Sequence, residues 1–274
     1  MIELPEALTL ARQSNEILAG KKVVHVFNAT KLHRFTFFHD DPLEYDTQLR
    51  GKTIESAKGY GIFVDLVFTG GTILSIGDGT NMKYGNPGDT IPAHYQLLIT
   101  FEDESFLVFT VAMYGSIGVY PDGIIEEKYH TLSASGISPL SGNYTEEIFR
   151  KLFTGTKKDL SAKALLATEQ RIPGVGNGVL QDILFNARIH PKRKISTFSE
   201  KDRSVLFRSL KTTLQEMTDL NGRDTQKDLL GNNGVYKTIL SAKTWKNPCP
   251  VCGGEIVKEN FLGGTIYYCP ACQL

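Results

Sequence analysis

The four cysteines of this 274-residue chain lie near its C-terminal end, as Cys249 with Cys252 and Cys269 with Cys272. Their spacing, C-x2-C-x16-C-x2-C, is typical of a tetrathiolate zinc ribbon. Two disulfides are the alternative, but the first residues, MIELPEALTLARQ, lack the basic and apolar regions of a secretory signal. Because four thiolates leave no open position for water, we predict a structural Zn2+ that holds a hairpin too small for its own core.

The net charge of zero conceals a division between the two halves of the chain. Residues 1–150 hold 11 Lys and Arg against 19 Asp and Glu, a balance of −8, and residues 151–274 hold 19 against 11, a balance of +8. The C-terminal half therefore has the positive excess that a polyanion partner requires. The alternative is that the charges are scattered over solvated faces.

Composition indicates an ordinary globular protein, with 41% apolar and 22% charged residues. No apolar run approaches the roughly 20 residues needed to span a bilayer, so we expect no membrane partner. We expect a cytoplasmic monomer.

None of the six histidines forms a pair with metal-ligand spacing, and we interpret them as structural or surface groups.

Residues 160–191 predict two helices joined by a glycine turn. Ser161 suits the N-cap of the first helix, and the second begins near Asn177. The turn Pro173-Gly174-Val175-Gly176-Asn177 lets the backbone approach a partner closely, and the helix after it offers unpaired N–H groups to a phosphate. Such a turn is also common as plain architecture between packed helices.

The rest of the chain divides into a β-rich part and a helical part. From residue 21 to about residue 118, short β-rich runs between turns predict an antiparallel sandwich. These runs are residues 23–27, 34–38, 62–68, 72–76, 95–101 and 105–111. Helices are predicted at residues 3–18, 145–153 and 199–217, a long exposed loop at 81–93, and the connection between domains at about 120–143.

The central stretch resembles a known DNA-repair element. Gln170, the Gly-Val-Gly-Asn turn, Leu184-Phe185 and Ile189-His190-Pro191 together resemble the helix-two-turns-helix element of the formamidopyrimidine-DNA glycosylase and endonuclease VIII family. Residues 228–234 and the ribbon cysteines resemble the same family. The resemblance implies that Asn177, with Gly174 and Gly176, binds a phosphate of double-stranded, damaged DNA.

With this resemblance, we predict an α+β multidomain fold. Residues 1–130 would form an N-terminal antiparallel β-sandwich with an N-terminal helix, and residues 131–144 a linker. Residues 145–244 would form the helix-two-turns-helix DNA-binding domain and residues 245–274 the zinc ribbon, a zinc finger that enters the minor groove.

The start of the chain resembles the family's catalytic start, with one change. Met1-Ile2-Glu3-Leu4-Pro5-Glu6 stands where the family has Met-Pro-Glu-Leu-Pro-Glu, whose first proline attacks the sugar. The side chain of Ile2 carries no nucleophile, so the usual proline Schiff base is not expected. The resemblance implies catalytic roles for Glu3 and Glu6, and for Asp182, where the family has a Glu directed at the pocket. The alternatives are that Glu3 and Glu6 only favour the dipole of their own helix, and that Asp182 is an exposed surface group.

Three other positions of the family have changed. Tyr60 stands where the family has the lysine of its DNA-contacting hairpin, and Lys58 is a cation that can reach a phosphate instead. The loop that fills the gap left by a flipped base keeps only Tyr114 as an aromatic wedge. Gly264 replaces the arginine of the ribbon hairpin. All three changes remove charge from the predicted interface, so AP-lyase activity is doubtful.

Two functions are consistent with these residues. In the first, the chain is a base-excision-repair hydrolase, a DNA N-glycosylase in which Glu3 or Asp182 activates water and no covalent sugar intermediate forms. In the second, it is a catalytically inactive binder of damaged or distorted DNA. Release of a base from a lesion-containing duplex would separate them.

Overall fold

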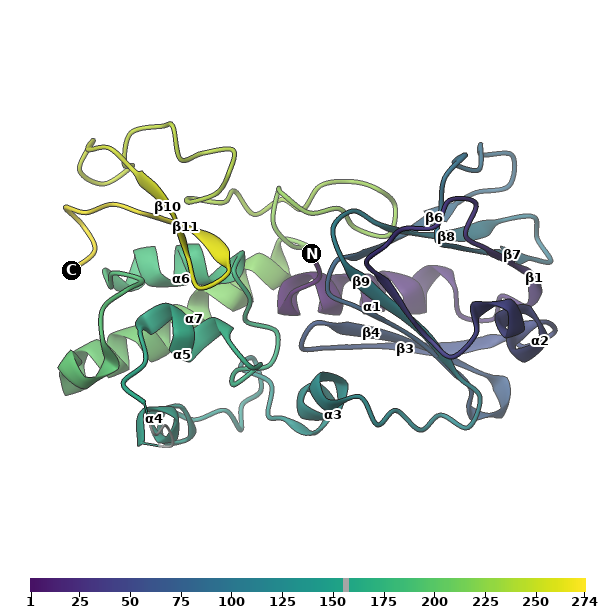
Figure 1. Cartoon of the computed structure of the whole chain (residues 1–274), viewed down its shortest axis with the longest axis horizontal. Helices are drawn as coiled ribbons and strands as arrows, with labels where there is room; N and C mark the ends of the chain where they lie inside the picture. The colour runs from purple at the N-terminus through teal and green to yellow at the C-terminus, as the bar shows by residue number, and fades with distance from the viewer. Residues whose placement is uncertain (155–157) are drawn as a thin grey trace.

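The computed structural model describes residues 1–154 and 158–274, which form two lobes on either side of helix α1, Leu4–Ile17 (Figure 1). One lobe is a β-sandwich, and the other holds the helices of the C-terminal half and the C-terminal hairpin. α1 belongs to both lobes, because Leu4 packs in the helical core and Leu10 in the sandwich core. The predicted α+β architecture is confirmed.

The sandwich contains a four-stranded and a five-stranded sheet. The first has the order β1 (Val23–Asn28), β7 (Leu97–Phe101), β8 (Phe106–Val111), β6 (Thr80–Gly85). The second has the order β2 (Thr36–His39), β9 (Gly115–Tyr120), β5 (Ile73–Gly77), β4 (Phe63–Phe68), β3 (Ile54–Tyr60). Each predicted β-run overlaps a strand. All pairs are antiparallel as predicted, except that β2 runs parallel to β9.

Two predicted connections contain regular structure. The first part of the loop predicted at residues 81–93 is instead strand β6, in which Thr80 and Met82 are buried while Asn81 and Lys83 are exposed. This alternation is the period of a strand, but the polar composition hides it. The connection predicted at residues 120–143 contains helix α3, Lys128–Ser135, whose first N–H groups are capped by Glu127. Strands β3 and β9 were also not predicted.

The helical lobe is built as its sequence predicts. Ser161 caps α5 (Ala162–Ala167) by accepting from Ala164, and Ser199 caps α7 (Glu200–Asp219) by accepting from Asp202. Between them lies α6, Val179–Ala187, which is buried along nearly its whole length. The short elements of the chain are η1 (Pro42–Glu44), α2 (Tyr45–Leu49), η2 (Thr69–Gly71) and η3 (Ile195–Thr197).

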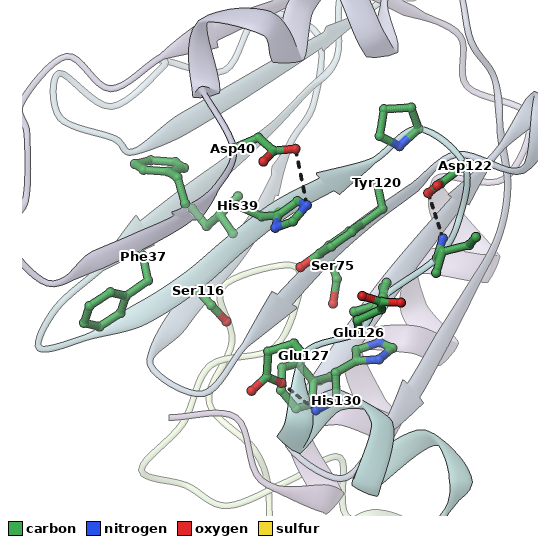
Figure 2. A pocket seen from close by; sticks show the side chains of 17 residues that line it. Phe37, His39, Asp40, Ser75, Ser116, Tyr120, Asp122, Glu126, Glu127 and His130 are labelled. Carbon is green, nitrogen blue, oxygen red and sulfur yellow. Dashed lines mark hydrogen bonds and ion pairs between the residues drawn. The ribbon is translucent and has the colours of Figure 1, made fainter.

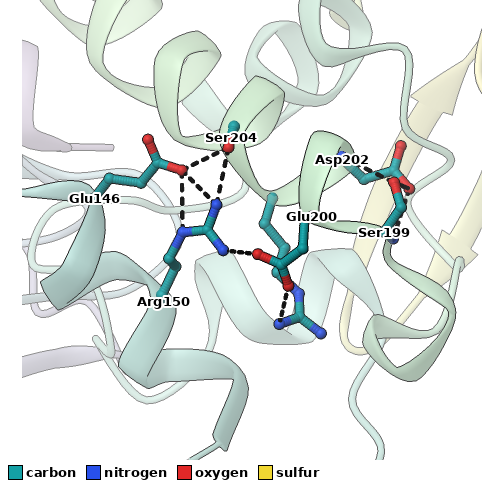
Figure 3. A network of polar contacts seen from close by, with 7 residues as sticks. Glu146, Arg150, Ser199, Glu200, Asp202 and Ser204 are labelled. Atoms are coloured by element: carbon teal, nitrogen blue, oxygen red, sulfur yellow. Dashed lines mark hydrogen bonds and ion pairs between the residues drawn. The ribbon is translucent and has the colours of Figure 1, made fainter.

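A polar network attaches helix α4, Glu146–Thr154, to the start of α7 (Figure 3). The guanidinium of Arg150 donates to Glu146 on its own helix, and to Glu200 and Ser204 on α7. Ser204 in turn donates to Glu146, 2.6 Å away. Because each group has more than one partner, the network fixes how α4 lies on α7, while Phe149 of α4 enters the core beneath it.

The C-terminal hairpin lies against α6. It consists of the antiparallel strands β10 (Val257–Phe261) and β11 (Gly264–Tyr268). The amide of Gln181 on α6 accepts from the N–H of Tyr267 and donates to the carbonyl of Thr265. Across residues 1–154 and 158–274, no helix combines the length and apolarity needed to cross a bilayer.

Gly59 allows α1 to lie directly on β3, because a Cβ at this residue would overlap the carbonyl oxygen of Ala7. Gly59→Ala should force the helix away from the sheet and lower the free energy of unfolding by about 1–3 kcal/mol, measured by urea denaturation. Gly142→Ala is the matched control, since a Cβ there meets no atom within 4 Å. Equal stability of the two variants would contradict this packing.

Candidate nucleic-acid interface and active site

A cleft of about 900 Å³ opens between the two lobes. Its wall comes from parts of the chain that are far apart in sequence. They are residues 1–3, residues 176–178 before α6, the side chains of Arg223, Thr225 and Gln226, and residues 260–265 at the tip of the ribbon hairpin. Of the three acids predicted as catalytic, only Glu3 lines this cleft.

The carboxylate of Glu3 is held at the start of α6. It is 1% exposed, and its oxygens accept from the N–H groups of Gly178, at 2.8 Å, and Val179, at 2.7 Å. The carboxyl group of Glu3 therefore lies at the positive end of the dipole of α6 as well as at that of its own helix. Burial raises the pKa of Glu3, while Arg223 and the two N–H groups lower it. The balance leaves the pKa of Glu3 raised, and a carboxyl group with a raised pKa at a cleft wall suits a general acid or base.

Arg223 joins Glu3 to Glu6. Its Nε and Nη2 donate to the two oxygens of Glu6 at 2.9 and 2.8 Å, and its Nη1 lies 3.3 Å from Oε2 of Glu3. All three side chains are at most 5% exposed. Glu6 therefore binds Arg223 and does not line the cleft. The sequence contained no sign of this arginine.

Asp182 lies on α6 but is turned to the segment that leads to the ribbon. Its oxygens accept from the N–H groups of Ile239, at 2.9 Å, and Leu240, at 2.8 Å. It is 1% exposed, which excludes the alternative of an ordinary surface group. Burial raises its pKa to about 6, although both N–H bonds act in the opposite direction. The prediction that Asp182 faces the pocket is wrong, because Asp182 does not line the cleft and instead accepts from the backbone that leads to the ribbon.

The turn before α6 keeps part of its hydrogen-bonding capacity free. Asn177 donates from Nδ2 to the carbonyl of Thr265 at 2.8 Å, while its Oδ1 is buried without a partner. The N–H of Gly174 is bound by Gln170, whereas those of Gly176 and Asn177 have no acceptor in the described part of the chain. The turn thus offers two N–H groups and the side chain of Asn177 at the cleft wall.

Three residues predicted to bind DNA do not line the cleft. Gly174 packs against Leu4, because a Cβ at residue 174 would crowd the side chain of that leucine. Lys58 is exposed on β3. The hydroxyl of Tyr60 is bound by Asp65 and lies 3.0 Å from Nε2 of His130. Tyr60 therefore points into the sandwich lobe, where its hydroxyl contacts the buried side chains of Asp65 and His130.

The cleft wall also contains Tyr114 and the residues around Ile2. Burial, together with the neighbouring charge of Asp78, raises the pKa of Tyr114 to about 12. Ile2 is 4% exposed and its N–H donates to the carbonyl of Asp78 at 2.6 Å. Ile2, which the sequence resemblance sets at the proline position of the family, is thus an apolar core residue with a bonded amide.

The hairpin tip is fixed by Lys163, a second residue that the sequence did not indicate. This lysine is 3% exposed, and its ammonium donates to the carbonyls of Phe261, at 2.5 Å, and Gly264, at 3.5 Å. Burial lowers its pKa. A Cβ at Gly264 would stand 3.3 Å from the side chain of Asn177, so the glycine lets the hairpin close on the turn before α6.

The four cysteines come together as their spacing predicts. All four Sγ atoms lie within 4.8 Å of one another, and the cysteines are free thiols. Cys249 and Cys272 are 3.8 Å apart, and Cys252 and Cys269 are 3.5 Å apart. Four sulfurs around a tetrahedral ion at about 2.3 Å would be separated by roughly 3.8 Å. The cluster therefore fits one metal ion, and the disulfide alternative is not formed.

Comparison with known proteins agrees with this geometry. Residues 136–228 match the family model described as Formamidopyrimidine-DNA glycosylase H2TH domain. Among solved structures, the MutM (Fpg) protein of Thermus thermophilus superposes with a TM-score of 0.80 at 24% identity, over 99% of this chain and 98% of that one. Lactococcus lactis Fpg bound to DNA with an abasic site gives a TM-score of 0.83 at 22% identity, over 99% of both chains. These likenesses show the fold.

Relatives in sequence extend over the whole chain. The formamidopyrimidine-DNA glycosylase of Cytobacillus firmus is 30% identical over 100% of both chains. That of Brevibacillus brevis is 28% identical over 100% of this chain and 99% of its own. This chain therefore belongs to the formamidopyrimidine-DNA glycosylase family.

Proposed function

We propose that this protein binds damaged double-stranded DNA across the cleft between its lobes and hydrolyses the N-glycosidic bond of a lesion base. The observation that carries the proposal is the carboxylate of Glu3. It alone among the predicted acids lines the cleft, and the N–H groups of α6 and Arg223 hold it in one position. The DNA-bound relatives support a duplex as the ligand.

In the proposed reaction, water takes the place of the proline nucleophile of the family. Glu3 accepts a proton from water, whose oxygen then attacks the sugar C1′ while the bond from C1′ to the base nitrogen breaks. The departing base receives the proton that Glu3 took from water, so Glu3 is regenerated and the products are the free base and an abasic site. The buried, bonded amide of Ile2 supports a route without the proline Schiff base.

One observation favours the second candidate, a catalytically inactive binder of damaged DNA. The position of the family's hairpin lysine is taken by Tyr60, whose hydroxyl is bound by Asp65 and His130 and does not reach the cleft. The position of the hairpin arginine is Gly264, which carries no charge. A protein of this kind would bind a lesion tightly and release no base.

A panel of duplexes with single lesions, including an abasic site, tests the chemistry. Wild type should release a base from at least one duplex and should not become covalently trapped by borohydride, because no Schiff base forms. Glu3→Gln should lose at least about 100-fold in rate, the range expected for removal of a general base. The matched variant Asp182→Asn should keep the chemistry and lose only stability. Tight binding without release would favour the inactive binder, and efficient trapping would contradict hydrolysis.

We further propose that Asn177 and the N–H groups of Gly176 and Asn177 bind a DNA phosphate. These N–H groups have no acceptor in the described part of the chain, and Nδ2 of Asn177, which donates to the carbonyl of Thr265, carries a second N–H. Asn177→Ala should weaken binding to all duplexes by about 1–3 kcal/mol and leave any lesion preference unchanged, because a phosphate contact carries no base information. Affinity for damaged and undamaged duplexes should be measured at two salt concentrations. Unchanged affinity, or binding insensitive to salt, would remove this turn from the interface.

We also propose that the cysteine cluster holds one structural Zn2+. The sulfur spacing fits four-coordinate zinc, and four thiolates would leave no position for substrate. Elemental analysis of freshly purified, reduced protein should give one zinc per chain. Chelation should unfold the hairpin and weaken DNA binding, since the hairpin tip forms part of the cleft wall. A zinc content near zero would contradict this assignment.

A further inference from the structure

A second cavity, of about 800 Å³, lies on the outer face of the five-stranded sheet (Figure 2). Strands β2, β9 and β5 form its floor, and the segment that leads into α3 forms its other wall. None of its lining residues lines the DNA cleft. This second cavity, called the sheet groove below, has no part in the proposed glycosylase reaction.

The floor of the sheet groove presents aromatic rings to solvent. Tyr120 stacks on His39 with ring centroids 4.2 Å apart and an interplanar angle of 19°. Phe37 is 59% exposed at the end of the same floor (Figure 2). Gly118 makes room for the stacked pair, because a Cβ at this residue would overlap the ring of Tyr120 and the Cβ of His39. Exposed rings held on a rigid sheet are typical of a binding surface.

Carboxylates surround this aromatic floor. Asp40, Asp122, Glu126 and Glu127 line the groove, and no lysine or arginine does. Asp122 accepts from the N–H of Ile124, and Glu127 caps α3, so both are fixed in place. Within the described residues, none of the four forms an ion pair with a lysine or arginine. Burial, and to a smaller extent the charge of Glu127, raise the pKa of Tyr120 to about 12. The groove is thus anionic as well as aromatic.

A buried hydroxyl points into the same space. Ser75 on β5 is 6% exposed and lines the groove, where its oxygen is directed towards the side of Glu126 (Figure 2). It has no hydrogen-bond partner in the described part of the chain. A hydroxyl that lines a cavity without a protein partner can donate to or accept from a ligand or water there. Ser75 therefore adds a specific hydrogen-bonding position to the anionic groove.

We propose that the sheet groove is a docking site for an arginine-containing segment of a partner protein. A guanidinium can stack on an aromatic ring and donate to carboxylates and a hydroxyl at the same time, which matches the floor, the rim and Ser75. Nucleic acid does not fit, because the groove has no lysine or arginine and residues 1–150 carry a charge of −8. Lysine lacks the planar group that stacks, so arginine is the better match.

Fluorescence anisotropy with a fluorescein-labelled peptide of alternating glycine and arginine tests this site on the full chain. Peptides with lysine or glutamine in place of arginine are the matched probes. Glu126→Gln and Phe37→Ala remove one carboxylate and one exposed ring of the groove. Glu55→Gln is the control, because it removes the same charge from an exposed position of the sandwich outside the groove.

The arginine peptide should bind wild type more tightly than the lysine peptide, and the glutamine peptide should not bind. Each groove variant should weaken binding about fivefold or more, and the control less than about twofold, as expected for loss of a desolvated cation contact. In wild-type protein, the imidazole NMR signals of His39 and His130 should shift on titration, since both line the groove. Equal binding by all variants, equal binding of both cationic peptides, or unshifted histidine signals would each overturn the proposal.

Discussion

The buried contact of Glu3 with the start of α6 and with Arg223 joins the two lobes of this protein. Glu3 precedes the helix that belongs to both cores, α6 is the centre of the helical lobe, and Arg223 comes from the segment beyond α7. Arg223 and the N–H groups of Gly178 and Val179 favour the ionised form of this carboxyl group, whereas burial to 1% exposure disfavours it. The same contact that fixes the lobes therefore places an acid with a raised pKa on the wall of the cleft.

The neighbouring acids are bound to other groups. Both oxygens of Glu6 accept from Arg223, and both oxygens of Asp182 accept from the backbone N–H groups of residues 239 and 240, so Glu3 is the one of these three acids on the cleft wall. Lys163 and Asn177 hold the ribbon hairpin over the same space.

The features that the sequence predicted are those with a local signal. The spacing of the cysteines, the caps Ser161 and Ser199, and the glycine turn before Asn177 depend on residues a few positions apart, and the structure has all of them. Arg223 could not be predicted, because its partner Glu6 lies 217 residues away. The same reason applies to Lys163 and Asp182, whose hydrogen-bond partners are also distant in sequence. The group that a buried charge contacts is decided by the tertiary fold and not by local spacing.

The most direct test of this account is the pH dependence of single-turnover base release in wild type and in the double variant Glu6→Gln/Arg223→Gln. The double variant avoids a buried, unpaired Glu6. Arg223 lowers the pKa of Glu3 by more than Glu6 raises it, so removal of both charges should still raise that pKa and move the acid limb of the profile to higher pH. An acid limb at the same pH in both proteins, with the variant folded, would contradict the claim that Arg223 favours the ionised form of Glu3 in the reaction.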